Sequence, residues 1–115
     1  MAIRCTIPNV SAVVFRKKDL TSEILRKAAE FSQVGDWYLY LKLLEKGKIS
    51  YNRKSLNSFR VHRSSVTDKA KKSKKHLEEI EYIQKMVRKQ YLLSETVIDS
   101  QNKEYMRVKQ RIVNN

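Results

Sequence analysis

Residues 77–112 read LEEIEYIQKMVRKQYLLSETVIDSQNKEYMRVKQRI, and the spacing of their apolar side chains indicates the fold class. Alternate steps of four and three residues, extended back to Val66, meet an apolar or tyrosine side chain at most positions. That period is typical of an amphipathic α-helix with one apolar stripe. The pattern predicts a long helix over residues 66–112, about 70 Å in length if unbroken. The side chains expected to form its interface are Leu77, Ile80, Val87, Tyr91, Ile98, Tyr105, Val108 and Ile112.

Polar residues interrupt this stripe at four positions, which are Ser73, Gln84, Ser94 and Gln101. Because each polar residue weakens a coiled-coil seam, the stripe favours packing against the N-terminal half of the chain. The stretch SETVIDSQN contains β-branched and capping residues, so a break near Ser94 or Ser100 is the alternative to a continuous helix. The part of the helix beyond Asp99 is expected to project or to pair with a second copy of the chain as a homodimer.

The N-terminal stretch, residues 2–15, is rich in β-branched residues and contains Pro8. It predicts an extended edge segment, or a short strand that ends at Pro8, lying against the helices. The first eighteen residues also contain cations and no acid, as mitochondrial presequences do, but the alternation of Ile3, Cys5 and Ile7 favours a strand.

A helical hairpin is predicted next. Residues 20–32 form an amphipathic pattern with Asp19 or Thr21 as the N-cap. A second helix is expected to begin at Gly35 and Asp36 and to end with Gly47 in the C′ position, where glycine commonly terminates helices.

The stretch 48–65 follows as a basic connector, either flexible or folded only on contact with a partner. Within it, the spacing of Leu56, Phe59 and Val66 after Ser55 is consistent with a further short helix.

The composition limits the class of protein. Two glycines and one proline in 115 residues favour long helices over an all-β fold. The single cysteine excludes an internal disulfide, and with two histidines it cannot build a Cys/His zinc site. No apolar run approaches the roughly 20 residues of a membrane span. We therefore expect one mainly α-helical domain over residues 1–115, with no cofactor and no membrane span. We expect it in a reducing compartment, the cytoplasm or the nucleus.

The charge is concentrated in one part of the sequence. The chain contains 25 Lys and Arg against 12 Asp and Glu, which gives a net charge of +13. Eleven of the cations lie between Lys46 and Lys75, opposed only by Asp68, so this band alone has a net charge of +10. The two flanking parts are nearly balanced. Because such a band repels itself, it predicts a polyanionic partner.

Nucleic acid is the polyanion that the band predicts, with RNA favoured over DNA because no helix-turn-helix or zinc pattern is present. Tyr51 and Phe59 lie among the arginines and could stack on unpaired bases. The cations expected to contact phosphate are Arg53, Lys54, Arg60, Arg63, Lys69, Lys71, Lys72, Lys74 and Lys75.

Two other classes of protein are alternatives. An enzyme is disfavoured because the sequence lacks a phosphate-binding glycine loop, a nucleophile elbow and a metalloprotease motif. An interaction protein is the main alternative, with its long helix docked on a partner and its cations against an acidic protein surface. The acids Glu78, Glu79 and Glu81 are expected to form a solvated helix face paired with lysines.

Overall fold

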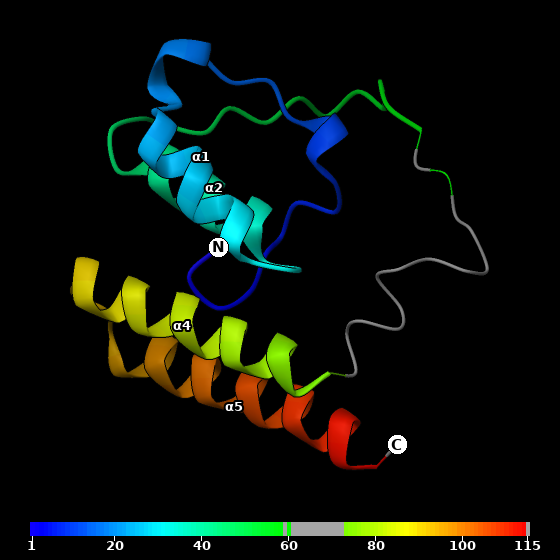
Figure 1. Ribbon diagram of the computed structural model, residues 1–115, viewed down its shortest axis with the longest axis vertical. Coiled ribbons are helices and arrows are strands. Elements are labelled where there is room, and N and C mark those ends of the chain that lie inside the picture. Colours follow the sequence, from blue (N-terminus) through cyan, green and yellow to red (C-terminus); the bar gives the residue numbers. More distant parts are fainter. Residues whose placement is uncertain (59, 61–72, 115) are drawn as a thin grey trace.

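The computed structural model describes residues 1–58, 60 and 73–114 and is mainly α-helical, as predicted. Two helical hairpins lie one above the other, and the N-terminal segment passes between them (Figure 1). No strand occurs in the described residues. The elements are η1 (Val10–Ala12), η2 (Lys17–Asp19), α1 (Ser22–Glu30), α2 (Gly35–Leu44), α4 (Lys74–Gln90) and α5 (Glu95–Val113).

The C-terminal stripe is divided between α4 and α5, which fold back on each other as an antiparallel hairpin (Figure 1). The break lies at Tyr91–Ser94, so the predicted alternative of a break near Ser94 is confirmed. Ser94 is the N-cap of α5, and its hydroxyl accepts a hydrogen bond from the backbone N–H of Val97 at 3.4 Å. Folding back lets both halves of the stripe bury their apolar side chains in one core. The expected beginning of the helix at Val66 lies outside the described residues.

One core joins the two hairpins. Its buried members come from α2 and the residue before it, from α4, and from α5: Val34, Trp37, Tyr38, Leu41, Ile80, Ile83, Val87 and Val108. Ile83 is completely buried. The predicted packing of the stripe against the N-terminal half is therefore present.

The N-terminal segment lies against the helices, as predicted, but the prediction that it is extended or a strand was wrong, because it bends at residues 3, 4 and 8 and forms the 3-10 helix η1. Its backbone carbonyls are instead held by side chains of the helices. The Trp37 indole N–H donates to the Met1 carbonyl at 2.9 Å, and Gln101 Nε2 donates to that of Ala2 at 2.7 Å. Gln84 Nε2 donates to the Ile3 carbonyl at 3.2 Å. The polar positions of the stripe thus fix the N-terminal segment in the core.

A buried carboxylate connects the hairpins. Glu79 Oε1 accepts the backbone N–H of Ser32 at 2.7 Å, and Oε2 accepts those of Gln33 at 3.0 Å and Val34 at 3.3 Å. The prediction that Glu79 belongs to a solvated face paired with lysine was wrong. That description fits its neighbours, because Glu78 lies 4.0 Å from Lys74 Nζ and Glu81 lies 2.9 Å from Lys85 Nζ.

The hairpin of α1 and α2 matches its prediction at the N-cap. Thr21 caps α1, and its hydroxyl accepts the backbone N–H of Ile24 at 3.2 Å. The role predicted for Gly47 was wrong, because α2 is capped at Glu45 and neither glycine has a positive φ. The short helix expected from Ser55 is also absent from residues 50–58, which are exposed and irregular. Phe59 and Val66 lie outside the described residues.

Gly35 is required by the close approach of α2 to α1. A Cβ at this position would lie 2.5 Å from the Ala28 carbonyl oxygen, whereas one at Gly47 would lie 3.2 Å from the Leu43 carbonyl oxygen. Gly35→Ala is expected to lower the free energy of unfolding by about 1–3 kcal/mol, because backbone must move to relieve the overlap. Urea denaturation followed by circular dichroism measures this. Gly47→Ala is the control, and equal effects of the two substitutions would contradict the packing argument.

Candidate nucleic-acid interface

The predicted phosphate contacts do not all fall in one place. Arg63, Lys69, Lys71 and Lys72, together with the predicted stacking residue Phe59, lie outside the described residues. Arg60 is exposed. The remaining four divide into two pairs, because Arg53 and Lys54 follow α2 whereas Lys74 and Lys75 begin α4. These pairs belong to two different basic surfaces.

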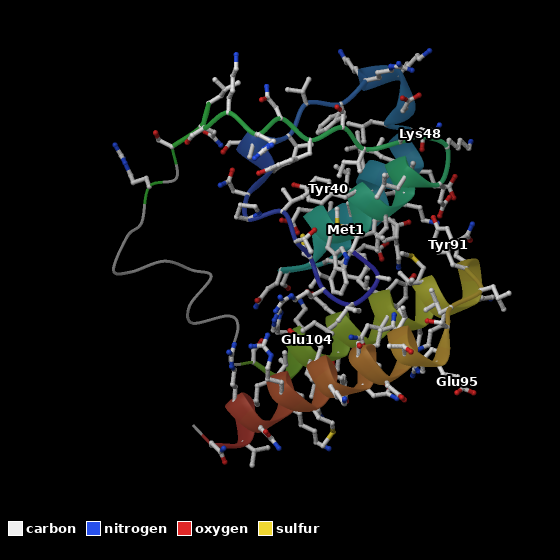
Figure 2. The ribbon with its side chains drawn as sticks, turned by 180° about the vertical axis from the view of Figure 1, so that it is seen from behind. Met1, Tyr40, Lys48, Tyr91, Glu95 and Glu104 are labelled. Atoms are coloured by element: carbon white, nitrogen blue, oxygen red, sulfur yellow. The ribbon has the colours of Figure 1, made fainter. Side chains whose placement is uncertain are left out.

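The first, the upper basic surface, combines segments distant in sequence. It consists of Arg16, Lys17 and Lys18 at η2 with Lys48, Arg53 and Lys54 after α2, all exposed. Both segments lie on the side of the molecule away from α5 (Figure 1), and Figure 2 shows Lys48 on that side. A hydrogen bond of 3.3 Å from Asn57 Nδ2 to Asn9 Oδ1 joins the stretch after α2 to the N-terminal segment. Within the described residues, none of the six cations forms an ion pair, and Asp19 is the only acid adjoining them in sequence.

The second, the hairpin basic end, arises because α4 and α5 run antiparallel. The first turn of α4 therefore lies at the same end of the hairpin as the last turns of α5 (Figure 1). Residues 73–77 and 106–114 contain five cations and no acid. The first turn of α4 also places its lysines at the positive end of the helix dipole. The hairpin basic end consists of Lys74, Lys75, Arg107, Lys109 and Arg111, all exposed.

Two acids border the hairpin basic end, because Glu78 lies 4.0 Å from Lys74 Nζ and Glu104 pairs with Arg107. Glu104 accepts a hydrogen bond from Arg107 Nε at 2.8 Å and a second from the same guanidinium. These hydrogen bonds hold the pKa of the Glu104 carboxyl below its usual value, although partial burial acts in the opposite direction, and Arg4 and Arg111 add to the lowering. Glu104 thus stays ionised and partly offsets the cations beside it.

The cations at η2 and on α5 were not among the phosphate contacts predicted from the sequence. Their signals were present, as three consecutive cations at 16–18 and as alternating cations at 107, 109 and 111. Averaging the charge over each flank concealed both runs, because acids at other positions of the same flank offset them in the sum.

Tyr51 is available for stacking. Its side chain is 85% exposed, and it lies in the irregular stretch between Lys48 and Arg53. An aromatic ring exposed among cations can stack on an unpaired base while the cations contact phosphate.

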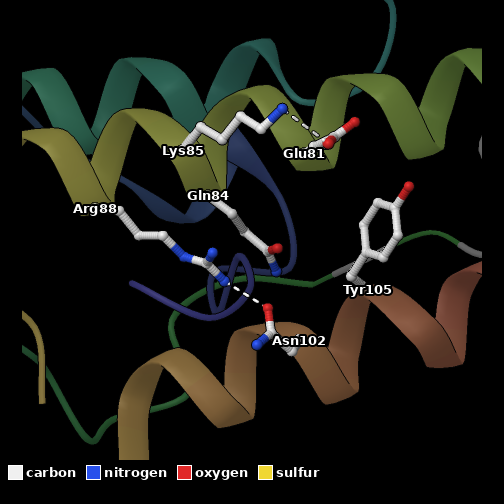
Figure 3. Close-up of a pocket in the computed structure, with 6 residues that line it drawn as sticks. All are labelled: Glu81, Gln84, Lys85, Arg88, Asn102 and Tyr105. Atoms are coloured by element: carbon white, nitrogen blue, oxygen red, sulfur yellow. Dashed lines mark hydrogen bonds and ion pairs between the residues drawn. The ribbon is translucent and has the colours of Figure 1, made fainter. Parts of the chain in front are cut away.

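A shallow pocket lies between α4 and α5 (Figure 3). Its cations are already engaged within the chain. Arg88 donates to Asn102 Oδ1 at 2.7 Å and to Gln101 Oε1 at 2.6 Å, and Lys85 pairs with Glu81 at 2.9 Å. The lining residues of the pocket are Glu81, Gln84, Lys85, Arg88, Asn102 and Tyr105.

The predicted helix-interface residues mostly face the interior. Ile80, Val87 and Val108 are buried in the core, and Leu77 and Ile112 pack against it. Ile98 and Tyr105 are half-buried, whereas Tyr91 is 41% exposed at the turn between α4 and α5.

Two side chains with nucleophilic atoms, Tyr40 and Cys5, are buried or half-buried. Burial raises the pKa of Tyr40 to about 12 and also raises that of the Cys5 thiol, so both stay protonated near neutral pH. In the part of the chain that the structure describes, no three His, Cys, Asp or Glu side chains are grouped so that they could hold a metal ion. None of the described helices combines the length and apolarity needed to cross a membrane.

The sequence matches no protein-family model, and no curated protein or solved structure shows significant similarity to it.

Proposed function

We propose that this chain is a non-enzymatic nucleic-acid-binding protein that prefers RNA to DNA. The observation that carries the proposal is the exposure of the cations in the upper basic surface and the hairpin basic end, which have few acids beside them. Like charges held this close together destabilise a compact fold unless an outside anion neutralises them. Nucleic-acid phosphates are such anions. When lysine and arginine side chains replace the cations condensed on the phosphates, the release of those cations drives binding.

The side chains present favour RNA with unpaired bases. Lysines dominate both surfaces, and a lysine ammonium contacts phosphate as a point charge without reading base sequence. The exposed ring of Tyr51 beside Arg53 supports stacking on a base that is not paired. Splayed single-stranded bases of this kind are the usual target of RNA-binding proteins.

The alternative is docking on an acidic protein surface, or on a second copy, through the apolar stripe of α4 and α5. Five of the eight predicted interface side chains pack within the core of the same chain, which leaves less of the stripe for a partner. The distribution of apolar surface therefore supports the nucleic-acid proposal more than this alternative.

The test is a titration of the protein, freed of bound nucleic acid, into labelled single-stranded RNA, duplex RNA and duplex DNA. At about 50 and about 200 mM salt, we expect the affinity to fall by orders of magnitude while a preference for single-stranded RNA persists. Equal binding to all three that vanishes at the higher salt would contradict the proposal.

A variant with four lysines replaced by alanine tests the site, namely Lys71, Lys72, Lys74 and Lys75. We expect about tenfold weaker binding and a salt slope smaller by about 0.7 for each single-strand phosphate that the variant no longer neutralises. The control removes four cations from α1, α2 and the middle of α4, namely Arg26, Lys27, Lys42 and Lys85. Equal losses of affinity in the variant and the control would mean that net charge, rather than this site, causes binding.

A further inference from the structure

The two basic surfaces lie at opposite ends of the molecule. The longest dimension of the molecule is 42 Å and is vertical in Figure 1, with η2 at the top and the end of α5 at the bottom. Figure 2 likewise shows Lys48 and Glu104 on opposite sides of Met1. The helical layers of α1, α2 and α4 separate the two surfaces.

The helices between the surfaces carry little net charge. Helix α1 has two cations and two acids, and α2 has one of each. Their lysines are also paired internally, because Lys27 lies 2.7 Å from Glu30 and Lys42 lies 2.9 Å from Glu45. In the middle of α4, residues 77–87 contain three acids and one cation, and that cation, Lys85, is paired with Glu81. Within the residues that the structure describes, these helical stretches thus present less net positive charge to a polyanion than either basic surface does.

The separation makes the surfaces electrostatically independent. Charges interact weakly in salt beyond the Debye length, which is about 8 Å at physiological ionic strength. The 42 Å dimension of the molecule is several times this length. Neutralising one surface with phosphate therefore leaves the attraction of the other almost unchanged.

We infer that one copy of this chain binds two nucleic-acid segments at once, one on the upper basic surface and one on the hairpin basic end. The chain then bridges RNA segments, a distinct activity that rests on the proposed function. Each surface is small and mostly lysine, so it holds its RNA segment through phosphates. The two surfaces of one chain therefore bring two strands together irrespective of their sequence.

Stoichiometry tests the inference directly. A single-stranded RNA too short to extend along the 42 Å dimension is titrated into the full chain, and the mass of the complex is measured by sedimentation. We expect two RNA molecules on one protein chain at saturation. In a capture assay, a protein bound to immobilised RNA should then retain a second, labelled RNA of unrelated sequence.

Three variants with matched charge changes locate the two sites. Arg16, Lys17 and Lys18 are replaced by alanine at the upper basic surface, and Lys74, Lys75 and Lys109 at the hairpin basic end. The control replaces Lys27, Lys42 and Lys85 between them. Either surface variant should bind one RNA per chain and show capture weaker by about tenfold or more, whereas the control should bind two.

The possible results separate this inference from the proposed function. Binding of one RNA per chain, with no capture of a second, would overturn the bridging inference and leave the proposed function intact. Two RNA molecules bound only by a pair of protein chains would also overturn it. Absence of any RNA binding would overturn both.

Discussion

Replacing Glu79 with alanine is expected to lower the free energy of unfolding by about 3–5 kcal/mol, because its buried carboxylate satisfies three backbone donors. The donors are the N–H groups of Ser32, Gln33 and Val34, which form the turn between α1 and α2. The side chain belongs to α4, and the residue is only 7% exposed. Removing it leaves the donors unpaired and removes a polar connection between hairpins that the shared core still joins. Urea denaturation followed by circular dichroism and by Trp37 fluorescence measures the loss of stability.

The neighbouring residue provides the control. The side chain of Glu78 is 62% exposed and lies 4.0 Å from that of Lys74, so Glu78→Ala is expected to change stability by less than about 1 kcal/mol. A Glu79→Gln variant keeps the shape but replaces one acceptor oxygen with a donor, and an intermediate loss of stability is expected. If Glu79→Ala unfolded at the same urea concentration as Glu78→Ala, the carboxylate would not be what joins the hairpins.

Gln101→Leu is expected to lower the free energy of unfolding by about 2–3 kcal/mol although it introduces an apolar side chain of similar size. Gln101 is completely buried. Its amide nitrogen donates to the Ala2 carbonyl at 2.7 Å, and its amide oxygen accepts from Arg88 Nε at 2.6 Å. Leucine cannot satisfy either partner, so the N-terminal segment is no longer attached to α5 at this point. Denaturation measures the global effect, and faster amide hydrogen exchange in residues 2–7 would locate it.

Gln110→Leu is the matched control, since Gln110 lies on the same helix and is exposed. It should leave both stability and exchange of the N-terminal segment nearly unchanged. If Gln101→Leu proved neutral or stabilising, Gln101 would act as an ordinary core position rather than as a polar anchor.

Sequence patterns correctly predicted the helix ends that depend on interactions within one helical turn. The cap at Thr21 and the break near Ser94 could be read because a hydroxyl accepting an N–H three residues later acts within one turn. The roles of Gln84 and Gln101 could not be read in this way. Each donates to a carbonyl at the other end of the chain, and in the sequence both residues look like defects in an apolar stripe.

The candidate interface was predictable only in part, for a similar reason. A run of cations can be counted along the chain, so Arg53, Lys54, Lys74 and Lys75 were found from sequence. The cations at η2 and on α5 belong to the same two surfaces but lie in parts of the sequence that are nearly neutral overall. Electrostatic potential depends on distance in space, which counting along the chain does not measure.

The sequence is enough to predict the mainly helical class, the hairpin of α1 and α2, the apolar stripe and the excess of cations. These follow from composition, caps and residue period, which act within a few turns of one helix. Tertiary contacts were needed to show that α5 folds back on α4, that the N-terminal segment fills the space between the hairpins, and that the cations form two opposed surfaces. Those features come from contacts between residues up to 99 positions apart, such as Ala2 and Gln101. They are favoured because the same packing buries the apolar side chains of the stripe and gives its polar side chains hydrogen-bond partners.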